Sequence, residues 1–331
     1  MSEAASEAAI LTEELAKSYG DLEAVKGIDL EVRAGEAFGF LGPNGAGKTT
    51  TINVLCTLLR PTSGRAMVAG LDVDEHPDRV RASIGLVFQD PSLDEQLTAR
   101  ENLEFHAFIY DVPASERKRR IAEVLEMVEL ADRAGSLVKT FSGGMRRRLE
   151  IARGVLHTPH VLFLDEPTLG LDPQTRRHIW AYLEELRKRE GITMFMTTHY
   201  MDEAEFCDRI AIIDGGRIQA EGTPEELKAL VGGDIVTAST GDDAIAAEEI
   251  RRIFGLEPIV DGGTVRVEVL DGAAFIPQLV RETSVPVTAV SFHRPSLDDV
   301  FIKLTGRAMR DEEADTKDRM RVMSRAWRSH R

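Results

Sequence analysis

Residues 36–50 read EAFGFLGPNGAGKTT, and this stretch decides the fold. The apolar run AFGFL predicts a short buried strand, and the segment TINVLCTLL from Thr51 onward has the spacing of a helix. Between them, Gly42 to Thr49 matches the pattern G-x-x-x-x-G-K-[ST] in full. A strand, a glycine loop and a helix in this order are the context of a phosphate-binding loop, in which backbone N–H groups and the helix N-terminus hold phosphate oxygens. The stretch therefore predicts an α/β domain with a phosphate site.

Several side chains in and beyond this loop suit nucleotide chemistry. Lys48 can reach the β- and γ-phosphates of a nucleotide, and Thr49 is placed to bind Mg²⁺. The run VLFLDE, Val161 to Glu166, supplies the carboxylates that the loop lacks. Asp165, at the end of a buried strand, suits the metal, and Glu166 is a candidate base or water-positioning group for in-line attack on the γ-phosphate. A lone Asp-Glu pair more often caps a helix or turn, but the apolar residues before it and the proline after it favour the site.

Two further polar residues follow apolar strands. His199 comes directly after ITMFMTT, at the mouth of the same predicted sheet. A single histidine is more often a hydrogen-bonded structural residue. At the carboxyl end of a core strand beside a phosphate site, however, it becomes a candidate contact of the γ-phosphate. Gln89 in VFQD gives a weaker signal, because glutamine is common at strand ends.

A second stretch also resembles an anion cradle. Residues Lys139 to Ala152 read KTFSGGMRRRLEIA, about a hundred residues after the first loop, with Ser142, Gly143 and Gly144 at the start of a predicted helix. The three arginines at 146–148 point in different directions on a helix. At most one or two of them can face a nucleotide, and we expect the rest to be solvated or paired with carboxylates.

The composition is that of a globular protein with an acidic balance. The 331 residues are 43% hydrophobic and 29% charged, and the formal net charge is -15. That charge argues against nucleic-acid binding, which depends on Lys and Arg at phosphates. No apolar run approaches the roughly 20 residues that cross a bilayer, and the start MSEAASEAAI is acidic where a signal peptide is basic. We expect a soluble chain with reduced, buried thiols at Cys56 and Cys207, so that any membrane-spanning segments come from another polypeptide.

The pattern of elements predicts an α/β domain with a largely parallel core sheet, followed by a small α+β domain. Predicted strands and helices alternate along the chain, except for a mostly helical insertion at about residues 92–157. Near Gly232 a second series of strands and helices begins. The expected divisions are a frayed tail at 1–9, the nucleotide domain at 10–230, the accessory domain at 231–306 and a charged tail at 307–331.

These motifs, in this order, resemble the nucleotide-binding subunit of ATP-binding cassette (ABC) transporters. GPNGAGKTT resembles Walker A, VLFLDEP Walker B and FSGGM the signature motif, with Phe141 in place of the commoner Leu. Gln89 matches the Q-loop, LGLD (Leu169 to Asp172) the D-loop and His199 the switch histidine. The resemblance covers residues 10 to about 225. It implies a P-loop NTPase fold, with a mixed core sheet and a helical insertion, that hydrolyses ATP with Mg²⁺.

The resemblance also implies roles for single residues. Glu166, His199 and Gln89 would be catalytic, and Thr49, Gln89 and Asp165 would bind the metal. Tyr19 would stack on adenine, although the residues alone favour a surface aromatic. The full set of ATP-binding residues that the resemblance implies is Tyr19, Gly42, Pro43, Asn44, Gly45, Ala46, Gly47, Lys48, Thr49 and Thr50.

The resemblance further implies a dimer. In such proteins the signature residues, here Ser142, Gly143 and Gly144, serve the ATP held by the opposite subunit, and Asp172 lies in the D-loop. The two phosphate-binding segments of one chain would then contact two different nucleotides, and each nucleotide would lie between two chains. Because this chain holds one cassette with its motifs intact, a homodimer is the simpler expectation, and a pair with a similar chain is the other.

The last predicted helix indicates a branch of the family. PSLDDVFIKLTGR, Pro295 to Arg307, resembles the terminal motif of the daunorubicin/doxorubicin-resistance type of ATP-binding subunit, which pairs with ABC-2 type membrane permeases. This implies a peripheral subunit on the cytoplasmic side of the membrane, powering export of a drug-like or lipid substrate. The alternative is a soluble ABC ATPase acting on ribosomes or DNA. Against it, the sequence shows neither a second cassette nor a long coiled coil or cysteine cluster between Lys48 and Asp165.

Overall fold

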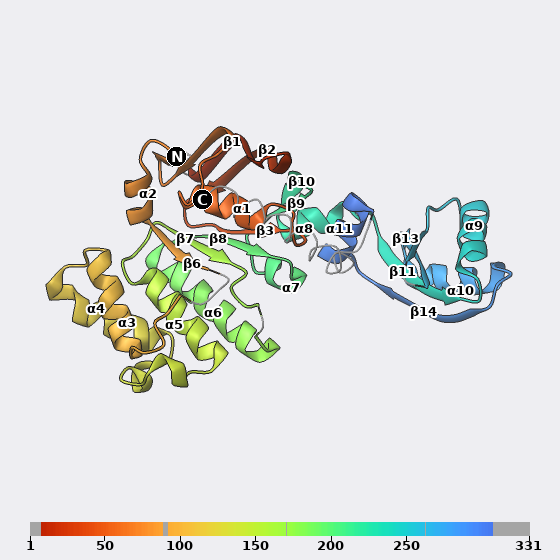
Figure 1. The fold of residues 1–331 in the computed structure, drawn as a ribbon. Coiled ribbons are helices and arrows are strands. Elements are labelled where there is room, and N and C mark those ends of the chain that lie inside the picture. The colour runs from red at the N-terminus through yellow and green to blue at the C-terminus, as the bar shows by residue number, and fades with distance from the viewer. Residues whose placement is uncertain (1–7, 89–91, 170, 262, 307–331) are drawn as a thin grey trace, which may run out of the picture. The chain divides into compact units, whose positions relative to one another are not determined.

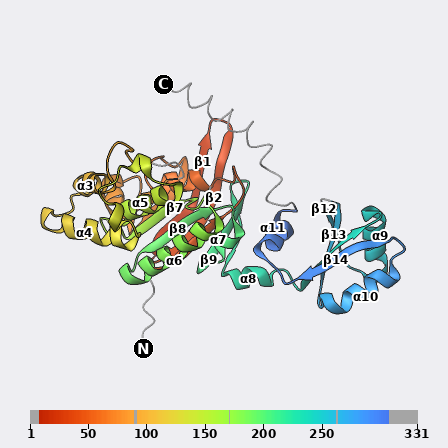
Figure 2. The same ribbon diagram turned by 90° about the horizontal axis from the view of Figure 1, so that it is seen from below.

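The computed structural model describes residues 8–88, 92–169, 171–261 and 263–306. They form two compact units that divide between Glu221 and Gly222. Figures 1 and 2 show the helices and strands of both units in two views. Within the described ranges, no helix combines the length and the apolar character needed to cross a membrane.

A six-stranded sheet lies at the centre of the first unit, in the order β10-β9-β3-β8-β7-β6. Neighbouring strands from β9 to β6 in this order run parallel. The bounds are β3 Ala37–Leu41, β6 Ile84–Val87, β7 Val161–Asp165, β8 Thr193–Thr198, β9 Arg209–Asp214 and β10 Arg217–Gly222. Because β3, β7 and β8 are buried along their whole length, they read as continuous apolar runs in the sequence. Their carboxyl ends meet at one edge of the sheet, which is where ligands bind in open α/β folds.

A second, antiparallel sheet has the order β2-β1-β4-β5. Its strands are β1 Ala8–Tyr19, β2 Leu22–Arg33, β4 Ser63–Val68 and β5 Leu71–Asp72. Strand β1 begins at Ala8, which pairs with Arg33 of β2, so the expected tail at 1–9 is wrong for its last two residues. Residues 1–7 of that tail lie outside the described residues. The sequence alone does not predict β4, β5 or the assembly of these strands into a separate sheet.

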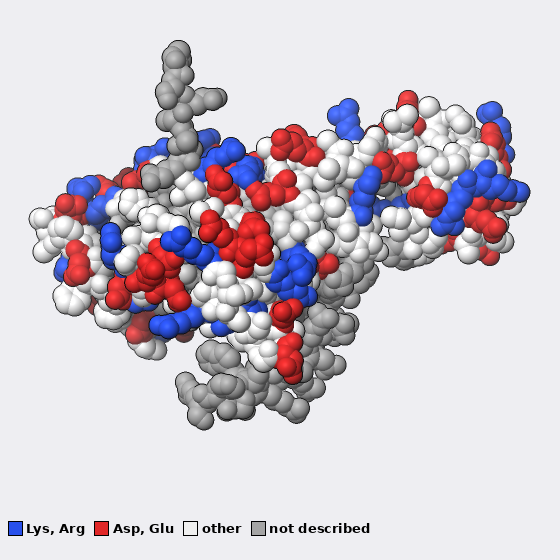
Figure 3. Space-filling model, turned by 90° about the horizontal axis from the view of Figure 1, so that it is seen from above, with Lys and Arg blue, Asp and Glu red and all other residues white. Residues whose placement is uncertain are grey.

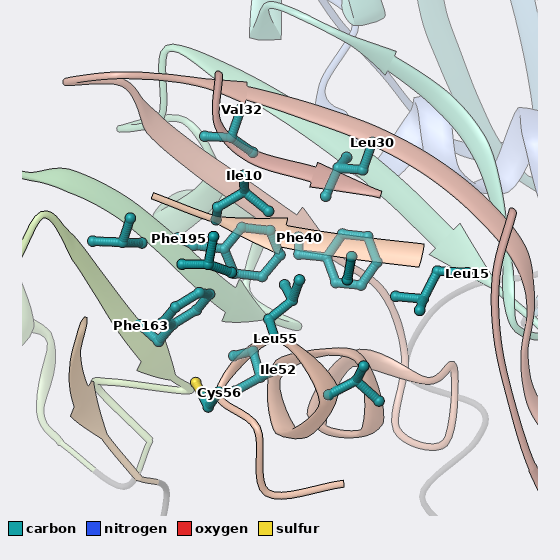
Figure 4. Close-up of a cluster of buried hydrophobic side chains, with 14 of the residues drawn as sticks. Ile10, Leu15, Leu30, Val32, Phe40, Ile52, Leu55, Cys56, Phe163 and Phe195 are labelled. Atoms are coloured by element: carbon teal, nitrogen blue, oxygen red, sulfur yellow. The ribbon is translucent and has the colours of Figure 1, made fainter. Parts of the chain in front are cut away.

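The main hydrophobic core joins both sheets to helix α1, Lys48–Leu55. The ring of Phe195 in β8 contacts Phe40 in β3 and Phe163 in β7, each with centroids 5.6 Å apart. Figure 4 shows these rings between α1 and the second sheet, which contribute Ile52, Leu55, Ile10, Leu30 and Val32. Each fully buried side chain of this size contributes about 1.5–3 kcal/mol relative to exposure. This packing holds the start of α1 beside the carboxyl ends of β3 and β7.

Further helices of the first unit follow α1 along the chain. The bounds are α2 Pro77–Ser83, α3 Ala99–Ile109, α4 Ala114–Met127, α5 Gly143–Val155, α6 Pro173–Glu190 and α7 Met201–Ala204. Helix α3 starts at a capping box formed by Thr98 and Glu101, and α6 ends at Gly191, whose φ of 68° lies in the left-handed region. Helices α3, α4 and α5 occupy most of the stretch from 92 to 157 and pack against one another.

The second unit follows the order β-α-β-β-α-β, with the antiparallel sheet β12-β13-β11-β14. This is the arrangement of ferredoxin-like α+β domains. The bounds are α8 Pro224–Ala229, β11 Asp234–Thr240, α9 Asp243–Phe254, β12 Ile259–Asp261, β13 Thr264–Val269, α10 Gly272–Glu282, β14 Val287–His293 and α11 Leu297–Thr305. The unit starts at Gly222 rather than at 231, because the unpredicted helix α8 packs against α11.

Candidate functional site

The glycine loop after β3 has the backbone that its sequence requires. Gly47 lies directly before α1 with φ 108°, a conformation that L side chains rarely adopt. A Cβ on Gly42 would lie 2.3 Å from the carbonyl oxygen of Ile213, so this position also excludes any side chain. The N-terminus of α1 therefore faces a loop whose backbone can approach phosphate oxygens closely.

Lys48 is buried and lies within the loop. Its Nζ donates hydrogen bonds to the carbonyl oxygens of Gly42 at 2.6 Å and Pro43 at 3.0 Å. The same atom lies 3.6 Å from Oε1 of Glu166, at the end of β7. The ammonium group thus lies between the phosphate loop and the Walker B carboxylate.

Asp165 is buried at the end of β7, close to the hydroxyl groups of two threonines. Its Oδ1 accepts a hydrogen bond from Oγ1 of Thr197 at 2.5 Å and lies 3.4 Å from Oγ1 of Thr49. Burial raises the pKa of Asp165 above its ordinary value, and the hydrogen bond from Thr197 opposes that effect. A carboxylate and a hydroxyl so close together form a set of oxygen ligands of the kind that Mg²⁺ prefers.

Glu166 adopts a strained backbone and points toward two basic residues. Its φ of 45° lies in the left-handed region, which is uncommon outside glycine and is seen at functional sites. Its Oε1 lies 3.1 Å from Nδ1 of His199, as well as near Lys48. Burial alone would raise the pKa of Glu166, but the hydrogen bond with His199 and the charge of Lys48 bring it below the ordinary value. The carboxyl group is therefore ionised at neutral pH and can accept a proton.

Tyr19 ends β1 and is half-buried next to the loop. Its hydroxyl is hydrogen-bonded to Thr50, and Nζ of Lys17 lies 5.5 Å from its ring centroid. Burial raises the pKa of Tyr19, with the Thr50 hydrogen bond as the smaller, opposing cause. The structure thus connects the hydroxyl of Tyr19 to Thr50, the residue that follows the G-x-x-x-x-G-K-[ST] pattern.

Two of the three signature residues border a pocket that contains no residue of the glycine loop. Ser142 caps α5, accepting a hydrogen bond from the backbone N–H of Met145 at 3.2 Å. Ser142 and Gly144 border a cavity of about 160 Å³, whose other lining residues include Met127, Arg148, Thr175, His178 and Tyr182. None of these lining residues belongs to the glycine loop.

Asp172 of the D-loop caps α6. It accepts hydrogen bonds from the backbone N–H groups of Gln174 and Thr175, both at 3.0 Å, and from Oγ1 of Thr175 at 2.6 Å. This position follows from its sequence, because an aspartate before Pro173 is a strong helix start. Gln89, the remaining expected site residue, lies outside the described residues.

Two buried charged residues near the site are missed by sequence reasoning. Arg147 on α5 donates to carbonyl oxygens of the Walker B segment, including those of Asp165 and Glu166. Glu203 on α7 accepts hydrogen bonds from Thr168 and Thr198. One available signal for Arg147 is its spacing: it lies four and eight residues before the buried Ile151 and Val155, on the apolar stripe of the helix. Arg146 and Arg148 are paired with carboxylates, as expected.

Comparisons with known proteins agree with this geometry. The ABC transporter family profile matches residues 25–169, and that of the ATP-binding protein DrrA1-3-like C-terminal domain matches residues 222–305. The daunorubicin resistance ATP-binding protein DrrA2 of Streptomyces coeruleorubidus is 42% identical over 315 residues, covering 92% of this chain and 98% of that protein. The linearmycin resistance ATP-binding protein LnrL of Bacillus subtilis is 39% identical over 310 residues, covering 90% and 99%.

A solved structure shares the fold of the first unit. The ATP-binding cassette MJ0796, in a dimeric post-hydrolysis state bound to ADP and Pi, has 31% sequence identity and a TM-score of 0.60. The match covers 65% of this chain and 98% of that one. These findings confirm the predicted P-loop NTPase fold. The chain therefore belongs to the DrrA-type ATP-binding proteins of ABC transporters, which are ATPases coupled to transport.

Proposed function

We propose that this chain is the ATP-hydrolysing subunit of an ABC-2 type exporter, peripheral to the cytoplasmic face of the membrane. The observation that carries the proposed mechanism is the position of the Glu166 carboxyl group at the carboxyl edge of a parallel sheet, where its Oε1 lies 3.6 Å from Nζ of Lys48 and 3.1 Å from Nδ1 of His199. The export function rests on the similarity to relatives named for resistance to daunorubicin and linearmycin. We propose a drug-like or lipid cargo: the drug-like class rests on both names, and the lipid class rests on the family resemblance alone.

In the proposed reaction, the glycine loop and Lys48 hold the β- and γ-phosphates of ATP. Glu166 positions the attacking water and accepts its proton, because its carboxyl group is ionised and the site is buried. His199 orients Glu166 through the contact at its Nδ1, and we propose that it also contacts the γ-phosphate. Tyr19 stacks on adenine.

Asp165 and Thr49 have the oxygen donors and the spacing to hold Mg²⁺. When bound, the ion neutralises charge on the β- and γ-phosphate oxygens. The fit is supported by the burial of Asp165, because a divalent cation stabilises a carboxylate whose charged form burial disfavours. Gln89 is proposed as a further ligand on the family resemblance alone.

Two chains would share the nucleotides. Ser142 and Gly144 line a surface pocket that has no lining residue from the glycine loop, and Gly143 lies between them in the sequence. This position suits the three residues for contact with ATP held by a second subunit. Asp172, which starts α6, would lie at the same contact between subunits. The solved cassette MJ0796 is dimeric, which supports this arrangement.

Helix α3 offers a surface for the permease. Phe105, Phe108 and Ile109 on this helix are 63%, 66% and 54% exposed. Large exposed apolar side chains gathered on one helix mark sites of protein contact. Because α3 packs against α5, a displacement of α3 by the permease can be transmitted to the signature residues at the start of α5.

The alternative, a soluble ATPase acting on ribosomes or DNA, has less support. The net charge is -15, and Figure 3 shows basic and acidic side chains interspersed over the face in view. Nucleic-acid binders gather Lys and Arg along a face. Purification of the full-length chain from its native membranes tests the choice: a multi-spanning protein as its partner supports the exporter, and ribosomes as its only partner contradict it.

Glu166→Gln tests the assignment of the base. The amide keeps the shape of the side chain but cannot accept a proton, so we expect ATP hydrolysis to be lost while ATP binding persists. A steady-state phosphate-release assay measures hydrolysis, and titration with a fluorescent ATP analogue measures binding. Glu185→Gln, a change at an exposed position of α6, is the matched control and should behave as the unmodified chain. Normal hydrolysis by Glu166→Gln would show that another group is the base.

A further inference from the structure

Arg147 is a buried arginine whose partners are mostly backbone carbonyl groups. It lies on α5, five residues after the signature serine, and is 8% exposed. Its Nη2 donates to the carbonyl oxygens of Asp165 and Glu166, both at 3.2 Å, and its Nε donates to that of Pro167. Its Nη1 donates to the carbonyl oxygen of Phe88 at 2.5 Å. Three consecutive carbonyl groups of the Walker B segment thus point at one guanidinium group.

The charge of Arg147 is balanced within the same helix. Nη1 lies 3.1 Å from Oε2 of Glu150, which is 1% exposed. Oε1 of Glu150 in turn accepts the backbone N–H of Ser92 at 2.6 Å. A guanidinium has five N–H donors, and the described residues supply Arg147 with five acceptor groups, which are those four carbonyl groups and this carboxylate. A lysine, with three donors on one nitrogen, cannot reproduce this planar arrangement.

These bonds bear directly on the conformation of Glu166. Its φ of 45° carries strain that only the surrounding structure can maintain. On one side its N–H donates to the carbonyl oxygen of Thr197 at 3.2 Å and lies 3.1 Å from the hydroxyl oxygen of the same residue. On the other side its carbonyl group accepts from Arg147. Hydrogen bonds thus hold both the N–H and the carbonyl group of Glu166, whose carboxyl group lies near Lys48 and His199.

We propose that Arg147 is a positioning residue for hydrolysis, holding Glu166 in the orientation that activates water. This rests on the proposed role of Glu166 as the base. Arg147 also means that helix α5 is connected to two nucleotide sites. Ser142, the cap at the start of α5, would contact the nucleotide of the partner subunit in the proposed dimer. Arg147, later on the same helix, holds the Walker B segment of its own subunit. Movement of α5 on dimer closure would therefore act on the base of its own site.

Arg147→Gln and Arg147→Lys in the full-length chain test the proposal. Loss of an orienting partner of this kind lowers activity about 10- to 100-fold. We expect that loss in kcat for both variants, with KM for ATP and the affinity for a fluorescent ATP analogue within about twofold of the unmodified chain. A role in folding alone would instead lower the melting temperature and the active fraction and leave kcat per folded molecule unchanged.

Arg120→Gln is the matched control. Arg120 on α4 has a largely buried side chain, lies 3.4 Å from Glu123 three residues later, and donates to the carbonyl oxygen of Leu156 at 3.4 Å. It has the same kinds of partner as Arg147, but these partners lie on α4 and at the end of α5 rather than in the Walker B segment, so its kcat should be unchanged. A comparable fall in kcat with Arg120→Gln would show that any loosening of α5 suffices, and would overturn the proposal.

The remaining outcomes separate this inference from the function on which it rests. If Glu166→Gln is inactive and Arg147→Gln keeps its kcat within about twofold, the inference is wrong and the base assignment stands. If Glu166→Gln retains normal hydrolysis, the base assignment is wrong, and the inference with it. If Arg147→Gln fails to fold, Arg147→Lys decides, and a folded lysine variant with normal kcat overturns the proposal.

Discussion

Glu203 is an acid buried at a meeting point of three segments near the nucleotide site. Its carboxyl group accepts from Oγ1 of Thr168, after the Walker B motif, and from Oγ1 of Thr198 at 2.5 Å, at the end of β8. Nε of Arg176, in the first turn of α6, lies 3.7 Å away. A single side chain therefore joins the Walker B segment, the switch-histidine segment and the start of α6.

The pKa of Glu203 is raised to about 7, chiefly by burial and to a smaller extent by the nearby charge of Glu166. The hydrogen bond from Thr198 and the nearby charges of Arg176 and His199 lower it, but by less. Because the folded-state pKa lies above the ordinary value of 4.5, the contribution of this group to stability is fully present below about pH 4.5 and is lost as the pH rises through about 7. A difference of one in pKa between the folded and unfolded states corresponds to about 1.4 kcal/mol of stability.

Glu203→Gln should remove this pH dependence, because the amide resembles the protonated carboxyl group. We expect the variant to be more stable than the unmodified chain by about 2–3 kcal/mol near pH 8 and by little near pH 5. Thermal unfolding at a series of pH values measures the difference, with the exposed Glu205→Gln as control. A difference that is constant with pH, or largest at low pH, would contradict the prediction.

At the scale of elements, Ser142 serves α5 as its cap and, in the proposed dimer, serves the partner's ATP. Ser142→Asp separates the two roles. Aspartate is as good a cap as serine, whereas its charge would repel the phosphates of a second subunit's nucleotide. We expect normal thermal stability and normal ATP binding by the isolated chain, with loss of ATP-dependent dimers in size-exclusion chromatography. Ser142→Ala, which loses the cap, should cost about 1 kcal/mol. Loss of ATP binding by the monomer would mean that Ser142 contacts the nucleotide of its own chain.

The elements differ in how far the sequence predicts them. Strands β3, β7 and β8 are predictable because burial on both faces makes each an apolar run. Helix α2, helix α8 and strand β5 have 7, 6 and 2 residues, too few to show a period, so contacts with distant residues decide them. The same holds at the site. The predicted residues come together because parallel strands end at one edge, whereas the acceptors of Arg147 lie 18 to 59 residues away in the chain, apart from Glu150.

At the scale of the whole molecule, each of the two compact units has a hydrophobic core among its described residues. One joins the two sheets of the first unit, and the other lies between the sheet of the second unit and its helices α9 and α10. Helix α11 is fastened to the sheet of the second unit by Asp299, which is buried. Its carboxylate accepts from the hydroxyl group of Ser296 at 2.6 Å, lies 3.0 Å from Nε2 of His293, and pairs with Arg266 of β13. The aspartate of the terminal motif thus has structural partners on two strands of that sheet.

Asp299→Asn should loosen the second unit alone. Burial would raise the pKa of Asp299, but the hydrogen bonds with Ser296 and His293 lower it below its ordinary value, so the charged form stabilises the fold at neutral pH. Breaking such a buried, hydrogen-bonded pair costs about 3–5 kcal/mol. We expect faster hydrogen exchange in residues 234–305 and unchanged exchange in residues 8–221, measured by mass spectrometry. The affinity for ATP, measured by fluorescence, should also be unchanged. The exposed Asp298→Asn is the control. Faster exchange in both units would show that their cores unfold together.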